Sequence, residues 1–132
     1  MRAAHIISVL ILLAILAAGC QAAPSQTTDS PASKALIAYL NALAAKDETT
    51  LTLLSCADWE ANALLELDAF QSVETRLQGL SCGQNTAADG SVTVTCQGKI
   101  LASYFNEQQE FDLSQRTYNM VEQGGDWLVC GY

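Results

Sequence analysis

The segment CGQNTAADGSVTVTCQGKILASY, residues 82–104, decides the fold of this chain. Apolar and polar residues alternate around Val92 and Val94, and a period of two is typical of a strand with one buried face. Asp89-Gly90, just before this alternation, is a tight-turn signal. The segment therefore predicts an antiparallel hairpin whose turn is centred near Asp89.

The same period of two continues towards the C-terminus, where Phe111 and Leu113 repeat it. Turn signals follow at Asn106-Glu107 and at Gly124-Gly125. We expect an antiparallel meander of about four strands that ends on residues 126–132.

Upstream of the hairpin the apolar spacing changes to three and four residues, which predicts helices. Ser30-Pro31 is an N-cap followed by proline at the first helical position, and Asp47 can cap a second, short helix. The buried stripe of a third helix is expected at Trp59, Ala63, Leu67 and Phe70. Helices followed by strands predict an α+β fold in which N-terminal helices pack on one face of a curved antiparallel sheet.

The N-terminus has the order of a secretory signal: Arg2, then an apolar run from residue 6 to 18, then Gly19 and Cys20. The run is shorter than the roughly 20 apolar residues of a membrane-spanning helix. Residues 16–20, LAAGC, resemble the bacterial lipobox, which implies cleavage before Cys20 and acylation of its thiol. The alternative is an ordinary signal that leaves Cys20 as an odd cysteine.

This interpretation divides the chain into a signal peptide (1–19), a lipidated cysteine with a flexible tether (20–32) and one α+β domain (33–132). The tether is rich in Ser, Thr, Ala and Pro and cannot bury enough surface to order itself. The implied location is the cell envelope, anchored by lipid on the extracytoplasmic face. Gln21 after the cysteine favours the outer membrane if the host has two membranes.

Four cysteines remain for the domain, and the compartment favours disulfides. A turn near Asp89 places Cys82 opposite Cys96, and Cys56 and Cys130 then pair by elimination. The competing pair, Cys96 with Cys130, joins strands about 9 to 10 Å apart, beyond the usual limit of about 7 Å. We prefer the first pattern.

Charge and composition exclude several function classes. Loss of Arg2 changes the net charge from −8 to −9, so the clustered positive charge that nucleic-acid binding needs is absent. The single histidine, His5, lies in the signal, and no C-x-x-C spacing occurs, so we expect neither a metal nor another cofactor.

Lys46-Asp47, residues 54–60 (LSCADWE), residues 96–100 (CQGKI) and the ending WLVCGY (127–132) are similar to small bacterial lipoproteins of the nuclear-transport-factor-2-like superfamily. That resemblance covers roughly residues 33–132. It implies a cone-like fold with a pocket between the sheet and the helices, stapled here by two disulfides. None of these stretches is a catalytic motif, and function does not travel with fold.

Aromatic residues are the candidates for lining such a pocket, although the same residues can simply form the core. They are Trp59, Phe70, Tyr104, Phe111 and Tyr118. An isomerase of this fold requires an inward carboxylate beside a tyrosine, but Asp112 alternates with Phe111 and Leu113 and should point away from them. The acidic residues near the third helix are interpreted as a solvated face, not as a calcium site; they are Asp58, Glu60, Glu66 and Asp68.

The sequence thus favours a membrane-anchored lipoprotein without catalytic residues, whose domain binds a small apolar ligand or an envelope protein. The alternatives are an isomerase- or cyclase-like enzyme that uses Asp and Tyr in the cone, and a structural component of the envelope.

Overall fold

The structure, a computed structural model, describes residues 28–132. The expected signal peptide, the lipidation site Cys20 and most of the expected tether lie outside the described residues.

Three helices come first in the chain: α1 (Pro31–Ala45), α2 (Glu48–Leu53) and α3 (Glu60–Phe70). The Ser30 side chain accepts a hydrogen bond from the Ser33 amide, and Pro31 occupies the first turn, so α1 begins where its cap signal predicted. Ala32 and Ser33 are fully buried. The folded part therefore begins a few residues before the domain boundary that we set at residue 33.

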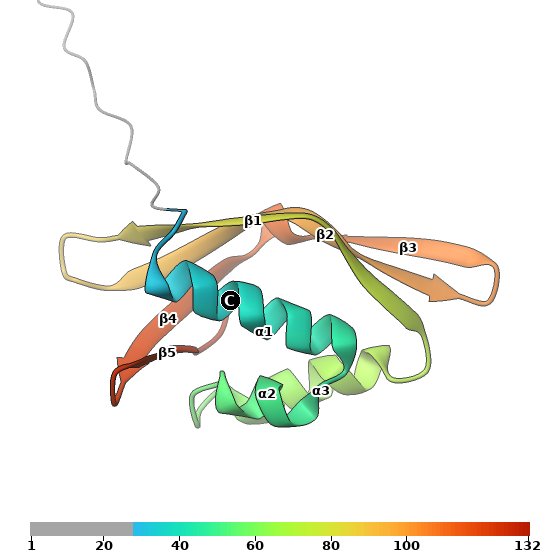
Figure 1. Cartoon of the computed structure of the whole chain (residues 1–132), viewed down its shortest axis with the longest axis horizontal. Helices are drawn as coiled ribbons and strands as arrows, with labels where there is room; N and C mark the ends of the chain where they lie inside the picture. Colours follow the sequence, from blue (N-terminus) through green and yellow to red (C-terminus); the bar gives the residue numbers. More distant parts are fainter. Residues whose placement is uncertain (1–27) are drawn as a thin grey trace, which may run out of the picture.

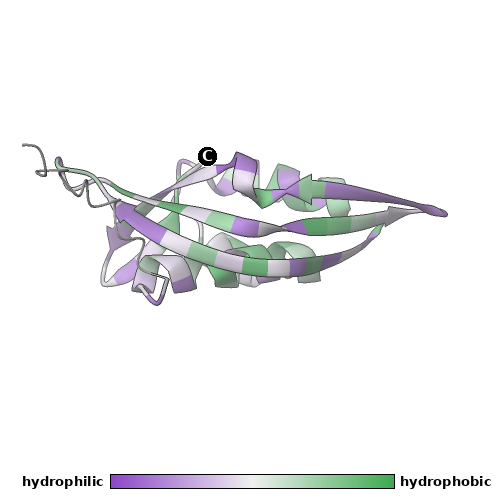
Figure 2. Cartoon of the chain, turned by 90° about the horizontal axis from the view of Figure 1, so that it is seen from above, coloured by the Kyte–Doolittle hydropathy of each residue, from purple (hydrophilic) through white to green (hydrophobic). Residues whose placement is uncertain are grey.

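Five strands follow the helices: β1 (Glu74–Thr86), β2 (Val92–Tyr104), β3 (Glu107–Asp112), β4 (Thr117–Gln123) and β5 (Asp126–Val129). They form one antiparallel sheet of order β1-β2-β4-β5, in which β3 pairs with β2 beside β4. Along the long strands apolar and polar residues alternate (Figure 2). Because the sheet has five strands and both β3 and β4 pair with β2, it is not the simple four-stranded meander that we expected.

The extra strand arises because a single helical turn separates β3 from β4. The Asp112 side chain accepts a hydrogen bond from the Ser114 amide and caps a single 3₁₀ turn, Leu113–Gln115. The turn before β3 also lies one residue earlier than predicted, at Phe105 and Asn106, because Glu107 already pairs with Tyr104.

A bulge between β1 and β2 accompanies the curl of the sheet. The register between the two strands shifts between Gln78 and Ser81. Gly98 lies opposite the shift, and a Cβ atom there would lie only 2.6 Å from the Gln78 carbonyl oxygen. A residue with a side chain cannot be accommodated, and a bulge of this kind bends the strand and increases its twist.

Helix α1 lies across the concave side of the curled sheet, with α2 and α3 beside it (Figure 1). It packs against β1, β2 and β5 as well as against the other two helices. The inward face of α1 is fully buried at Leu36, Tyr39, Leu40 and Leu43. None of the described helices has the length and apolar character needed to cross a membrane.

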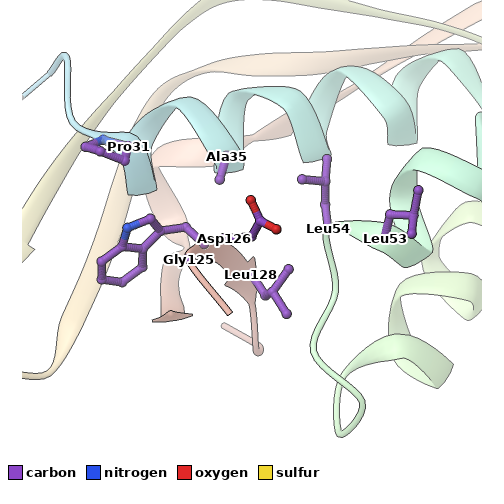
Figure 3. Close-up of a pocket in the computed structure, with 8 residues that line it drawn as sticks. Pro31, Ala35, Leu53, Leu54, Gly125, Asp126 and Leu128 are labelled. Carbon is purple, nitrogen blue, oxygen red and sulfur yellow. The ribbon is translucent and has the colours of Figure 1, made fainter. Parts of the chain in front are cut away.

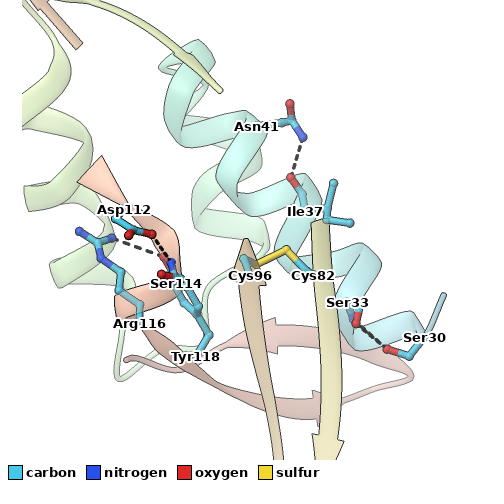
Figure 4. The surroundings of a disulfide bond; sticks show 10 residues. All are labelled: Ser30, Ser33, Ile37, Asn41, Cys82, Cys96, Asp112, Ser114, Arg116 and Tyr118. Carbon is cyan, nitrogen blue, oxygen red and sulfur yellow. Dashed lines mark hydrogen bonds between the residues drawn. A yellow bond between two sulfur atoms is a disulfide. The ribbon is translucent and has the colours of Figure 1, made fainter. Parts of the chain in front are cut away.

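Two disulfides join the pairs that we preferred. Cys82 lies directly opposite Cys96 in the β1–β2 register, and this disulfide faces α1 (Figure 4). Cys56–Cys130 ties the segment before α3 to the C-terminus. The fold is thus α+β with helices on a curled antiparallel sheet. Among residues 28–132, the buried core and both disulfides lie between Ser30 and Tyr132, so the oxidised chain from Gln21 onward contains all of them.

Candidate functional site

An open groove of about 510 Å³ lies between α3, the sheet and the C-terminal residue. We call it the aromatic groove. Its apolar walls are formed by Trp59, Leu65, Phe70, Tyr104, Phe111 and Tyr132. Ala69 and three polar side chains, Asn62, Glu66 and Arg116, also line it. This volume and this mixture of many apolar and few polar groups are typical of small-molecule sites.

Edge-to-face contacts hold the walls in place. Phe70 on α3 packs against Phe111 on β3, with ring centroids 5.5 Å apart. At the other end, Tyr132 packs against Trp59 at 5.3 Å and against Tyr118 at 5.2 Å. Such geometries are favoured between aromatic rings, so the walls are held without a ligand.

The Trp59 indole is fixed from two further directions. Its Nε1–H donates to the Tyr39 hydroxyl at 3.1 Å. Gly131, at φ +122°, lies against the indole, and a Cβ atom there would lie 3.4 Å from the ring. The Cys56–Cys130 disulfide joins the two segments that carry Trp59 and Tyr132.

A partly buried ion pair between Arg116 and Glu66 lies in the groove. Arg116 Nη1 lies 2.5 Å from Glu66 Oε1, and the side chains are 21% and 11% exposed. The Arg116 guanidinium also stacks over the Tyr132 ring, 4.2 Å from its centroid. Tyr132 donates a hydrogen bond to Glu66 Oε1 at 3.3 Å. The other carboxylate oxygen, Oε2, is buried and has no hydrogen-bond partner.

Burial changes the acid–base properties of this cluster. It raises the pKa of Tyr118 to about 12, although the nearby Arg116 partly opposes the shift. Burial likewise raises the pKa of Tyr39 and, together with the Glu66 carboxylate, that of Tyr132. For Arg116, burial opposes the charge, but the Tyr118 hydroxyl and the Glu66 carboxylate outweigh it and raise its pKa. At neutral pH the tyrosines are therefore protonated and Arg116 is charged.

Local sequence explains how Glu66 and Arg116 reach the groove. Glu66 lies three residues after Ala63 and four before Phe70, which places it on the buried stripe of α3. Arg116 precedes the buried Tyr118 by two residues, in the run that leads into β4. A period of two puts both side chains on one face, and Arg116 Nη1 donates to the Tyr118 hydroxyl at 3.4 Å (Figure 4).

The structure brings the five candidate pocket residues into one region. Trp59, Phe70, Tyr104 and Phe111 line the aromatic groove. Tyr118 is fully buried behind Tyr132 and belongs to the core.

One sequence-based interpretation was wrong. Glu66 does not belong to a solvated acidic face, because its neighbours Arg116 and Tyr132 remove it from water. Asp58, Glu60 and Asp68 are exposed. Sequence reasoning also missed Arg116 and Tyr132, although the spacing of Arg116 from Tyr118 was a usable signal.

Asp112 lies outside the site. It is exposed, and its carboxylate is occupied by the 3₁₀ turn, whose Ser114 hydrogen bonds lower its pKa. It cannot act as a base in the groove. Within residues 28–132, no group of three or more metal-ligating side chains is gathered in one place.

Comparison with known proteins gives no family for the chain. No protein-family model matches it, and no curated protein or solved structure is significantly similar to it. The geometry of the aromatic groove is therefore the main indication of function.

A second hollow of about 460 Å³ lies between α1, α2 and β5 (Figure 3). We call it the β5 hollow. The described residues that line it are mainly apolar, and Asp126 is the one charged residue among them; the apolar ones are Pro31, Ala35, Leu53, Leu54, Trp127 and Leu128. It is similar in size to the aromatic groove but contains no buried ion pair.

Proposed function

We propose that this protein is a lipid-anchored, extracytoplasmic binding protein that holds a small, mainly apolar ligand in the aromatic groove. The observation that carries the proposal is the pre-formed groove of about 510 Å³, with aromatic walls and a partly buried ion pair. Burying a charge pair is often no more stabilising than apolar packing, so such a pair in a groove points to a role in binding.

Two features support the proposed location. The oxidised pairs Cys56–Cys130 and Cys82–Cys96 suit a compartment outside the cytoplasm. The lipobox-like residues 16–20 would supply the anchor, and α1 begins only about ten residues after Cys20. The helices on a curled sheet also fit the cone-like architecture of the superfamily that the sequence resembles, and we propose membership on that basis.

A neutral fluorescent probe tests ligand binding. The oxidised chain 21–132 is titrated with N-phenyl-1-naphthylamine, whose emission rises in apolar surroundings. We expect saturable binding that is lost in Ala69→Trp, because Ala69 is an exposed residue of the groove that a large side chain would fill.

Leu53→Trp is the matched control, since Leu53 is exposed and lines the β5 hollow. It should bind the probe as the unchanged protein does. Absence of saturable binding, or equal binding by Ala69→Trp, would contradict the proposal and would leave partner binding as the better hypothesis.

One observation favours a second candidate, an isomerase-like enzyme. Glu66 is an inward carboxylate within 3.3 Å of a tyrosine hydroxyl, that of Tyr132. However, Arg116 and Tyr132 both donate to this oxygen, Oε1, and the other oxygen, Oε2, is inaccessible, so neither is free to take a proton from a bound molecule. Turnover of a 3-oxo-Δ5-steroid that is abolished by Glu66→Gln would support this candidate, and no turnover would exclude that reaction.

A further inference from the structure

The Glu66–Arg116 pair has a definite orientation in the aromatic groove. The arginine side chain is about twice as exposed as the glutamate, at 21% against 11%. The unpartnered oxygen of the glutamate, Oε2, is inaccessible. Of the two side chains, the arginine therefore presents more surface to a molecule that enters the groove.

Part of that guanidinium is free to bind. Both hydrogen bonds that Arg116 donates, to Glu66 and to Tyr118, come from Nη1. Within the described part of the chain, the only inaccessible side-chain polar atom without a partner is Glu66 Oε2. The Nε and Nη2 atoms of Arg116 therefore retain contact with solvent, and together they form one edge of the guanidinium fork.

This edge has the geometry that a planar anion requires. Two parallel N–H groups of an arginine match the two oxygens of a carboxylate. Among the described residues that line the groove, Arg116 is also the only one with a cationic side chain. Its charge is maintained at neutral pH, because Glu66 and Tyr118 outweigh the effect of burial on its pKa.

Apolar surface extends from this edge along the groove. Phe70, Phe111 and Tyr104 form one wall, and Leu65 on α3 is 69% exposed beside them. An extended apolar body placed there would cover the exposed leucine and gain the free energy of that burial.

We propose that the ligand is an amphipathic carboxylic acid, whose carboxylate binds the Nε–Nη2 edge of Arg116 and whose apolar body lies along Phe70, Phe111 and Leu65. The inference rests on the proposed ligand-binding function and names the chemical class of the ligand. An amine of the same shape fits poorly, because it would face the guanidinium while the free oxygen of Glu66 stays out of reach.

Three probes with one apolar body and different head groups test the inference: decanoate, 1-decanol and decylammonium. Each competes with N-phenyl-1-naphthylamine for the oxidised chain 21–132 at pH 7.4, below micelle-forming concentrations. We expect decanoate to bind about tenfold more tightly than decanol, the usual gain from charge-assisted hydrogen bonds. Decylammonium should be the weakest.

Two variants test whether Arg116 causes the preference for decanoate over decanol. Arg116→Lys keeps a charge beside Glu66 but removes the fork, and E66Q/R116Q removes both charges and leaves no buried ion unpaired. In both, the ratio of decanoate to decanol affinity should fall, to about one in the double variant. The control is Arg76→Gln, an exposed arginine that contacts Gln108 outside the groove and should leave the ratio unchanged.

The outcomes separate the two proposals. If the probe binds but decanol competes as well as decanoate, or if the Arg116 variants keep the preference, the carboxylate inference fails and ligand binding stands. If the probe does not bind and calorimetry detects no binding of decanoate, both fail.

Discussion

The β1–β2 hairpin and the aromatic groove are held together in different ways. In the β1–β2 hairpin each strand pairs with its sequence neighbour, and Cys82–Cys96 closes a loop between residues only 14 apart. Its charged residues Glu74, Arg76 and Asp89 are exposed. The groove gathers Glu66, Arg116 and Tyr132, which are separated by 50 and 16 residues, and it buries a charge pair. Local pairing is sufficient to form a hairpin, whereas the groove exists only when the whole chain has folded.

The largest expected effect on stability is the loss of either disulfide. Cys56–Cys130 links residues 74 apart, against 14 for Cys82–Cys96, so its loss should cost about 4 kcal/mol of unfolding free energy and loss of the hairpin disulfide about 3. Urea unfolding of Cys56→Ala/Cys130→Ala and Cys82→Ala/Cys96→Ala measures both costs.

The two disulfide variants should differ more in probe binding than in stability. Removal of Cys56–Cys130 releases Trp59 from Tyr132 and should weaken probe binding, whereas the hairpin variant should still bind below its unfolding transition. Equal probe binding by both folded variants would show that the groove does not depend on this link.

Loss of the ion pairs should have the next largest effect, and the two pairs should differ clearly in what they contribute. Glu66→Ala leaves Arg116 partly buried without its partner, and we expect a loss of about 3 kcal/mol. Lys99→Ala removes the pair Lys99–Glu110, whose side chains are 37% and 50% exposed, and should cost less than about 1 kcal/mol. Thermal unfolding of both variants decides the question, and equal costs would mean that the groove pair is effectively solvated.

The pH dependence of the unfolding free energy should also differ between the region of the groove and the β1–β2 turn. The pKa of Tyr118 is raised from about 10 to about 12 in the folded protein, so the native state holds its proton longer than the unfolded state. Its contribution is complete below pH 10 and should be lost as the pH rises from 10 to 12, at about 1 kcal/mol per pH unit. Tyr118→Phe should flatten this decline in urea-unfolding free energies.

The contribution of the β1–β2 turn to stability should instead be lost at acid pH. Hydrogen bonds from Ser91 lower the pKa of Asp89, so its contribution is lost as the pH falls through that lowered pKa. Because Asp89 is fully exposed, this acid effect should be smaller than the alkaline one. A larger effect of Asp89→Ala at acid pH than of Tyr118→Phe at alkaline pH would contradict the comparison.

The smallest effect is expected at the tip of the β2–β3 hairpin. Phe105 is fully exposed and adopts φ +56°, a conformation that costs a residue with a side chain about 1 to 2 kcal/mol. Phe105→Gly should therefore stabilise the protein, by up to about 1 kcal/mol once the greater freedom of glycine in the unfolded chain is included. A loss of thermal stability would instead indicate that the exposed ring makes a stabilising contact.

Sequence patterns predicted the hairpin well because its determinants are local. Alternation and the Asp89-Gly90 turn were enough to place Cys82 opposite Cys96. The patterns failed at Asp112. Its side chain accepts a hydrogen bond from the Ser114 amide and caps a 3₁₀ turn, which divides one expected strand into two. The tip at Phe105 was displaced because phenylalanine is not an expected residue at positive φ.

The groove could be predicted only in part. The aromatic candidates were found because large apolar residues on a buried face are visible in sequence. Glu66 was misassigned because an acidic residue on a helix is usually solvated, and its partner lies 50 residues away. No local pattern indicates that the last residue, Tyr132, packs on Trp59 and stacks with Arg116.

The most direct test of ligand binding in the aromatic groove is amide chemical-shift mapping of the oxidised chain 21–132 titrated with decanoate. Binding in the groove predicts saturable shifts clustered on α3, around Phe111 and Arg116, and at the C-terminal residues, with none at the Asp89 turn or around Leu53 in the β5 hollow. Shifts concentrated at the β5 hollow, or spread evenly over the surface, would contradict it.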